Sequence, residues 1–249
     1  MGQLYCSMKT LDGILVSMER TGSKQWLQGK AIKDPLKYDE DKMYKDDEVE
    51  IATHISQDQL NGARLFTSKY EYAKTLDKNI AYLEVGVGWG NSAKMFIDTT
   101  NAISADLLDF YNNADGTRVP GGADPGITEE GHEEYIKNKF SYHPNVNTIK
   151  GDMRKEFFKL KNRYDFMFFD GYTDRIFIRN VLKHASQLIN PNGVIGFTSY
   201  LIYDAIHYDR HPGVYQSVNE FLNLSNNWSV DGIVLHDLGF HEIYIKKNA

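Results

Sequence analysis

The sequence predicts an α/β protein built around a mostly parallel β-sheet. Short apolar runs of strand length alternate, along residues 56–249, with longer segments in which apolar residues recur at helical intervals. A glycine-rich turn joins one of these strands to a helix, and acidic residues follow several others. We expect seven strands with helices on both faces of the sheet, the last two strands forming an antiparallel hairpin.

Residues 1–55 precede this alternation and are expected to form a separate extension. Residues 33–50 are dense in charge, and residues 11–17 fit either a strand or a short helix. An extension in this place would cover an active site as a lid or build an interface between two copies of the chain. A mobile tail is the alternative. The domain proper then begins with a helix that Ser56 caps and that runs to Leu76.

The first strand, residues 80–85, leads directly into a glycine turn. Three glycines two residues apart follow it: Gly86, Gly88 and Gly90. Glycines allow a tight turn and a close approach to a ligand, and the helix expected from residue 91 offers free N–H groups. A dinucleotide fingerprint would need a glycine at position 91, where this chain has Asn91. The spacing therefore disfavours a nicotinamide-dependent oxidoreductase.

The second strand, residues 101–106, is expected to end at Asp106. This residue lies 20 positions after Gly86, close to the offset of about 20 at which an acid binds ribose in nucleotide-binding α/β units. A carboxylate suits that role because it accepts hydrogen bonds from both hydroxyls of a cis-diol. Asp109 is the nearby alternative. The glycine-rich stretch 109–131 leaves the same strand end, so we expect it to reach the substrate.

Asp152 and Met153 follow the third strand, residues 147–151. A carboxylate there would accept the amino group of an adenine, and a thioether would pack on the face of its ring. The alternative is that Asp152 only caps the next helix.

The fourth strand, residues 166–169, ends at Asp170, and a helix over residues 175–188 follows. The fifth strand, residues 194–197, comes after a turn at residues 190–193 and ends in Thr198, Ser199 and Tyr200. The remaining expected elements are a helix over residues 211–222 and hairpin strands over residues 228–236 and 241–245.

With these strand ends placed, residues 56–245 resemble the class I S-adenosylmethionine (AdoMet) methyltransferases. The run from Glu84 to Gly90 is similar to their first motif, and the resemblance implies their Rossmann-like fold. One subgroup is closer in pattern, the macrocin-type O-methyltransferases that modify sugars. The similar stretches are residues 169–172, 188–195 and 213–222. The residues that the resemblance implies for AdoMet binding are Glu84, Gly86, Gly88, Gly90, Asp106, Asp152, Met153 and Asp170.

The macrocin-type enzymes use a divalent metal held by acids that close the fourth and fifth strands. Asp170 matches the first acid, but Ser199 and its neighbours stand where the next two are expected. We expect no metal, because a hard divalent cation needs several oxygen ligands. His207 is the expected general base, since imidazole has a near-neutral pKa; a surface histidine is the alternative. The expected catalytic residues are Asp170, Tyr200 and His207.

The amino-acid composition limits which partners and sites we expect for this protein. The chain has 28 basic and 34 acidic side chains and a net charge of −6, with no long basic cluster, so binding to a nucleic-acid backbone is not expected. One cysteine, Cys6, excludes an intrachain disulfide and a cysteine-rich zinc site. No apolar run reaches the ~18 residues of a membrane span, and the N-terminus lacks a signal-peptide pattern. We expect a cytoplasmic protein.

The expected activity is in-line transfer of the AdoMet methyl group to a hydroxyl of a small molecule or sugar, with S-adenosylhomocysteine as the product. The protein would align the nucleophile and exclude water. A nucleic-acid methyltransferase is one alternative, disfavoured because residues 170–173 lack the Pro-Pro-aromatic sequence of adenine-N6 enzymes. A non-catalytic AdoMet-binding subunit is the other, since the fifth strand lacks its acids.

Overall fold

A computed structural model describes most of the chain from residue 55 onward, together with the backbone of two earlier strands. The described ranges are residues 4–9, 15–20, 55–111, 129–171, 174–202, 213–236 and 240–248. The two early strands, β1 (Leu4–Lys9) and β2 (Leu15–Arg20), pair antiparallel as a sheet of their own. The division of the chain near residue 55 remains a prediction.

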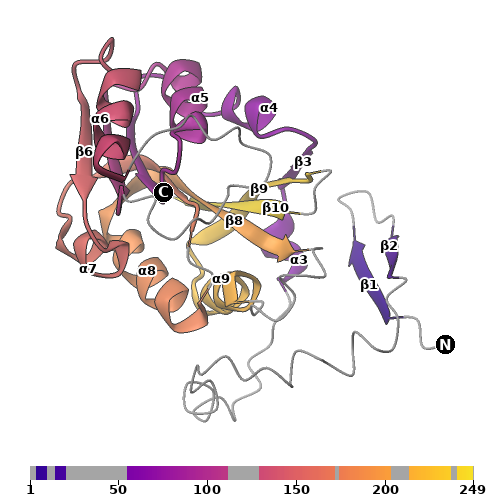
Figure 1. Cartoon of the computed structure of the whole chain (residues 1–249). Coiled ribbons are helices and arrows are strands. Elements are labelled where there is room, and N and C mark those ends of the chain that lie inside the picture. Colours follow the sequence, from indigo (N-terminus) through magenta and orange to yellow (C-terminus); the bar gives the residue numbers. More distant parts are fainter. Residues whose placement is uncertain are drawn as a thin grey trace, which may run out of the picture.

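The domain contains one eight-stranded sheet (Figure 1). In their order across the sheet, its strands are β3 (Arg64–Phe66), β9 (Trp228–Val234), β10 (Phe240–Lys247), β8 (Ile189–Ile202), β7 (Tyr164–Phe169), β4 (Ala81–Val85), β5 (Ser104–Asp109) and β6 (Val146–Lys150). Only β10 runs antiparallel to its neighbours, and it forms a hairpin with β9. The predicted mostly parallel sheet with a C-terminal hairpin is therefore confirmed, with β3 as an eighth strand.

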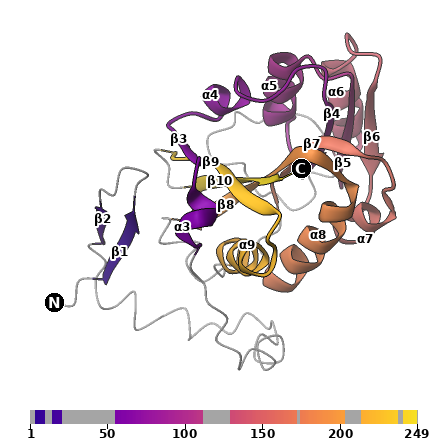
Figure 2. The same ribbon diagram turned by 180° about the vertical axis from the view of Figure 1, so that it is seen from behind.

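Helices cover both faces of the sheet, as Figures 1 and 2 show from opposite sides. The helices are α3 (Gln57–Leu60), α4 (Lys69–Ala73), α5 (Asn91–Thr100), α6 (Glu129–Lys139), α7 (Met153–Glu156), α8 (Arg175–Leu188) and α9 (Gly213–Leu224), with a short 3₁₀ turn, η2 (Phe157–Lys159). α4, α5 and α6 pack on one face, and α7, α8 and α9 pack on the other. Among the described residues, no helix has the length and apolar composition of a membrane span.

Alternation along the central strands builds a separate core on each face. In β7, Phe166 and Phe168 join the core under α4 and α5, whereas Met167 and Phe169 join the core under α8 and α9. All four side chains are buried. Strands covered on both faces are apolar throughout, which is why this run was recognisable in the sequence.

The single helix predicted from Ser56 to Leu76 is wrong. Ser56 does cap a helix, but α3 ends after one turn, near Gly62, whose φ is +87°. The chain then forms β3, which pairs in parallel with β9, before it begins α4. Pairing with a distant strand here overrides a helical spacing of apolar residues.

Two further boundaries differ from the prediction. β5 runs from Ser104 to Asp109, so the predicted strand end at Asp106 is wrong. The turn predicted at residues 190–193 is part of the long strand β8, where the pairing with β7 shifts register and Asn192 has a φ of +62°. By contrast, α8 has the predicted limits.

The parallel strands bring their carboxyl ends to one side of the sheet, which we call the carboxyl edge. β10 runs the opposite way, so its first residues lie at the same edge. Open α/β sheets bind ligands at such an edge. The stretches that follow β5, β7, β8 and β9 there, residues 112–128, 172–173, 203–212 and 237–239, lie outside the described part of the chain.

Candidate active site at the carboxyl edge

The glycine turn packs directly against the end of β7. Gly86 has a φ of +90°, and a Cβ atom built on it would lie 1.5 Å from the carbonyl oxygen of Asp170. The Asp170 N–H donates to the Val85 carbonyl at 2.8 Å, which joins the ends of β4 and β7. A side chain at position 86 would force these strand ends apart, so glycine is required there.

Gly88 presents its backbone to open space. Its φ is +49°, and a Cβ atom on it would meet nothing within 4 Å. Its N–H donates to Oδ2 of Asp109 at 2.8 Å, and its carbonyl contacts Nε2 of His132 at 2.8 Å. Gly90 differs, because a Cβ there would lie 3.0 Å from the side chain of Ile136. Of the three glycines, Gly88 is thus the one that a ligand can approach.

Asp109, not Asp106, ends β5 beside the glycine turn. Asp106 lies three residues earlier and accepts hydrogen bonds from Asn147 (3.0 Å), Asn162 (3.0 Å) and the Tyr164 hydroxyl (2.6 Å). The reason is the strand register, since pairing of β5 continues to Leu108 on the β4 side and to Asp109 on the β6 side. The structure therefore does not bring Asp106 to the glycine turn.

Glu84 is a fully buried carboxyl group on β4. It is 1% exposed and accepts a hydrogen bond from the hydroxyl of Tyr82. Burial raises the pKa of Glu84 to about 8, against the opposing effects of the Tyr82 hydrogen bond and the charge of Lys69. At neutral pH the group is mostly protonated, and a shift of this size beside a ligand-binding turn is typical of functional sites.

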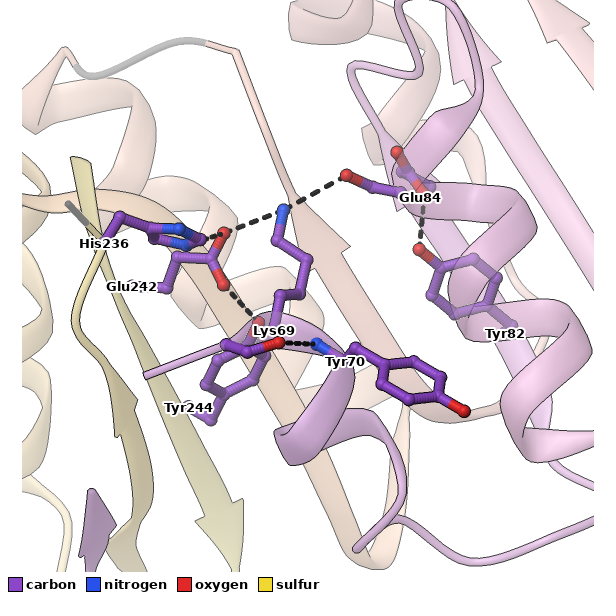
Figure 3. A network of polar contacts seen from close by, with 9 residues as sticks. Lys69, Tyr70, Tyr82, Glu84, His236, Glu242 and Tyr244 are labelled. Atoms are coloured by element: carbon purple, nitrogen blue, oxygen red, sulfur yellow. Dashed lines mark hydrogen bonds and ion pairs between the residues drawn. The ribbon is translucent and has the colours of Figure 1, made fainter. Parts of the chain in front are cut away.

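Lys69 lies between β4 and β10, with its ammonium directed toward Glu242 (Figure 3). From α4, its Nζ contacts Oγ of Ser92, in the first turn of α5, at 3.1 Å and Oε1 of Glu242, on β10, at 2.7 Å. Nζ also lies 4.4 Å from the centre of the Phe168 ring. Burial lowers the pKa of Lys69, but the charges of Glu242 and Asp170 outweigh this and raise it overall, so the ammonium stays charged.

Glu242 is the second buried carboxyl group at this edge and is 1% exposed. Besides Lys69, it binds the Tyr244 hydroxyl at 2.5 Å and Nε2 of His236 at 3.3 Å. Burial alone would raise the pKa of Glu242, but His236, Lys69 and Tyr244 together lower it below its usual value. Glu242 is therefore anionic at neutral pH, unlike Glu84.

Asp170 and Met153 lie at the same edge, whereas Asp152 is held by its own helix. Burial raises the pKa of Asp170, partly offset by the charge of Lys69. Met153 is buried, with its methyl group beside Gly171. Asp152 caps α7 and binds both the backbone and the guanidinium of Arg154 at 3.0 Å. These contacts show Asp152 in the role of a helix cap, which was the alternative interpretation of the sequence.

Two of the predicted catalytic residues are not brought to the glycine turn by the described contacts. Tyr200 is 5% exposed, and its hydroxyl donates to Oδ1 of Asn219 on α9 at 2.8 Å. Burial raises the pKa of this hydroxyl. His207 lies outside the described residues. Within the described part of the chain, no group of three or more His, Cys, Asp and Glu side chains is placed to hold a metal ion.

The sequence interpretation missed Lys69, His236 and Glu242. One signal was available, because Glu242 interrupts the apolar strand β10. A charged residue inside such a strand is buried and needs a partner. Nothing local identified Lys69 as that partner.

The glycine turn and the strands that follow it match a known family. Residues 83–200 match the family described as "Methyltransferase domain". The match supports an AdoMet-dependent methyltransferase. The matched part of the chain runs from β4 through β8 and includes Glu84, Gly88, Asp109 and Asp170.

Solved structures share the fold of this chain at low sequence identity. They include an rRNA-methylase candidate from Clostridium thermocellum (TM-score 0.50, 15% identity, 72% of this chain and 95% of that one). Another is the pyocyanin biosynthetic protein PhzM, with a TM-score of 0.48 and 15% identity over 72% of this chain and 53% of that one. An O-methyltransferase family protein from Burkholderia thailandensis has a TM-score of 0.48 and 12% identity over 72% of this chain and 55% of that one. This chain thus spans about half the length of each of the last two proteins. No protein of curated function matches the sequence.

Proposed function

We propose that the chain transfers the methyl group of AdoMet to a hydroxyl of a small molecule or sugar. The observation that carries this proposal is the glycine turn, in which Gly88 faces open space while its N–H is held by the acid that ends the next strand. When bound, AdoMet supplies an electrophilic methyl group on a positively charged sulfur. The family match over residues 83–200 supports the same cofactor.

The residues around the turn fit the parts of this cofactor. Asp109 would bind the ribose in place of Asp106, because the hydrogen bonds from the N–H groups of Gly88 and Tyr111 leave a lone pair on each of its oxygens for the hydroxyls. Met153 would pack on the adenine, and Asp152 would offer the adenine amino group the lone pairs that Arg154 leaves unused.

Acidic groups near the glycine turn suit a cationic ligand. Glu84 and Asp170 flank the turn, and both carboxyl groups have a raised pKa because they are buried. A cation bound beside them would favour their charged forms. We therefore assign Glu84 to the ammonium end of AdoMet and Asp170 to the methyl-transfer side, where it would align the acceptor hydroxyl.

The acceptor class rests on the sequence. The resemblance of residues 169–172 and 213–222 to sugar-modifying enzymes favours a sugar hydroxyl. The net charge of −6 argues against a nucleic-acid acceptor. Tyr200, which is bonded to Asn219, would support the acceptor side by fixing α9 rather than by touching the acceptor. The proposal needs no divalent metal, so methyl transfer should continue in the presence of a chelator.

Calorimetry with S-adenosylhomocysteine tests the cofactor assignment. We expect binding by the wild type, a loss of at least about tenfold in affinity in Asp109→Asn, and little change in the matched variant Asp106→Asn, because hydrogen bonds to a charged acceptor contribute roughly 1.5–3 kcal/mol. No binding by the wild type would refute the proposal. Equal losses in both variants would refute the assignment of Asp109.

A second experiment separates an enzyme from a binding subunit. Glycosides and phenols are incubated with methyl-labelled AdoMet and the wild-type chain. Label transfer is expected for an enzyme. Binding of S-adenosylhomocysteine without transfer to any acceptor would favour the non-catalytic subunit, for which the fifth strand end without acids, at residues 198–200, is the supporting feature.

A further inference from the structure

The proposed function leaves one part of the carboxyl edge unused, a polar chain that leads away from the glycine turn. It runs from Ser92 through Lys69 and Glu242 to His236, with contacts of 3.1, 2.7 and 3.3 Å. Figure 3 shows the last three of these residues. Buried charged groups are costly and are found mainly where they pair or serve a function. The last member of the chain, His236, carries an imidazole, the side chain that most often serves as a general base.

The strand directions place His236 on the substrate-binding side of the sheet. β9 runs parallel to β3, and the antiparallel β10 lies between β9 and β8, so β9 points the same way as β8 and β7. His236 lies two residues beyond the end of β9, and Glu242 pairs with Val234, the last residue of that strand. The imidazole therefore lies at the edge where Asp170 ends β7.

The contacts of His236 fix which nitrogen is free to accept a proton. Nε2 faces the carboxylate of Glu242, which is anionic and can only accept a hydrogen bond, so Nε2 carries the hydrogen. The lone pair of the neutral ring is then on Nδ1, for which none of the described residues provides a hydrogen-bond partner. The side chain is 29% exposed, in contrast to the buried Glu242. The backbone N–H of His236 donates to Nδ1 of His241 at 3.0 Å, which fixes the main chain.

Charged and titratable groups from the neighbouring elements surround this imidazole. They are Lys69 on α4, Asp170 at the end of β7, and His241 and Glu242 on β10. His236, Lys69 and Tyr244 together keep Glu242 anionic, and Glu242 fixes the ring of His236. A carboxylate that orients a histidine in this way is the recurring arrangement of a general base.

We propose that His236, oriented by Glu242, is the general base that removes the proton of the acceptor hydroxyl. This proposal rests on the proposed methyl transfer and replaces His207 in that role. The acceptor oxygen forms a bond to the methyl carbon while the carbon–sulfur bond breaks and its electron pair stays on sulfur. The hydroxyl proton passes to Nδ1 of His236, and the resulting imidazolium releases a proton to solvent. Glu242 and Lys69 are positioning residues in this step.

Nitrogen-15 spectra of histidine-labelled protein test the geometry without any acceptor. The signals of His236, identified by their loss in His236→Asn, should show a hydrogen on Nε2 and a lone pair on Nδ1. In Glu242→Gln, which keeps the size but removes the charge, this preference should be lost. A hydrogen on Nδ1 in the wild type, or spectra unchanged in Glu242→Gln, would overturn the proposal.

Methyl transfer to methyl glucoside and to catechol tests the role. We expect His236→Asn to slow single-turnover transfer by at least about 100-fold, as is usual for loss of a general base, with affinity for S-adenosylhomocysteine unchanged. His143→Asn, at a half-buried histidine that precedes β6, is the matched control and should be unaffected. Loss of activity in His207→Asn but not in His236→Asn would overturn the proposal.

The two sets of measurements separate failure of this proposal from failure of the proposed function. If the wild type does not bind S-adenosylhomocysteine, the methyltransferase assignment fails, whatever the histidine spectra show. If it binds the product but methylates neither acceptor, the spectra decide, and a hydrogen on Nδ1 of His236 is the result that rejects the base.

Discussion

The absence of a side chain at position 86 lets the end of β4 lie directly against the end of β7. Two separate effects act there, a left-handed backbone with φ of +90° and a Cβ position 1.5 Å from the Asp170 carbonyl. Gly62 has nearly the same φ, +87°, but has nothing within 4 Å of its Cβ position. Comparing substitutions at Gly86 and Gly62 therefore separates the cost of backbone strain from the cost of a steric clash.

We predict that Gly86→Ala lowers the free energy of unfolding by more than about 4 kcal/mol, whereas Gly62→Ala costs roughly 1–2 kcal/mol, the usual penalty of a left-handed non-glycine residue. Urea unfolding of both variants measures the difference. Equal losses would mean that the strand ends move apart without cost and that the glycine turn is not tightly packed against Asp170.

Glu84 makes the stability of the domain depend on pH. Its pKa is raised from the usual 4.5 to about 8 by burial, so between these values the folded state holds a proton that the unfolded state has released. Stability from this group is therefore complete below pH 4.5 and falls as the pH rises toward 8, by an amount on the order of 4 kcal/mol.

Glu84→Gln should remove most of that slope, because an amide keeps the hydrogen bond from Tyr82 without ionising. We expect the variant to exceed the wild type in stability at pH 8 and to match it more closely at pH 5. Urea unfolding at both pH values provides the measurement. A wild-type chain whose stability rose from pH 5 to pH 8 as steeply as that of Glu84→Gln would contradict the assignment of a protonated Glu84.

At the scale of elements, the sequence predicted what short-range patterns determine. α8 has its predicted limits because Asp174 caps it and its apolar residues recur with helical period. β4 and β7 were found because both of their faces are buried, which makes them mostly apolar. The glycine turn and Asp170 followed from these strands, since their positions depend only on where each strand ends.

Elements and site residues that depend on distant pairing were not predictable in the same way. β3 exists because it pairs with β9 from the other end of the domain, and its three residues carry no strand signal of their own. The end of β5 is fixed by its neighbours, and Asp109, not Asp106, lies beside the glycine turn. The contact between Lys69 and Glu242 likewise joins the two ends of the domain.

At the scale of the whole molecule, the fold suggests where the domain begins. Ile55 and Leu60 pack against the core under α8 and α9, and the side chain of Gln59 donates to the Leu222 carbonyl of α9. β3 is the edge strand of the sheet and pairs with β9. A chain that starts at residue 55 therefore keeps every described element of the eight-stranded sheet.

We predict that residues 55–249 fold alone, unfold in one cooperative transition and bind S-adenosylhomocysteine like the full chain. A fragment starting at residue 68 is the matched control, because it lacks α3 and β3 and exposes the edge of β9, a known cause of aggregation.

Light scattering of the full chain and of the longer fragment then tests the extension. If residues 1–54 build an interface between copies, the full chain is a dimer and the fragment a monomer, whereas a lid alters methyl transfer but not mass. Failure of the longer fragment to fold would place residues 1–54 within the domain itself.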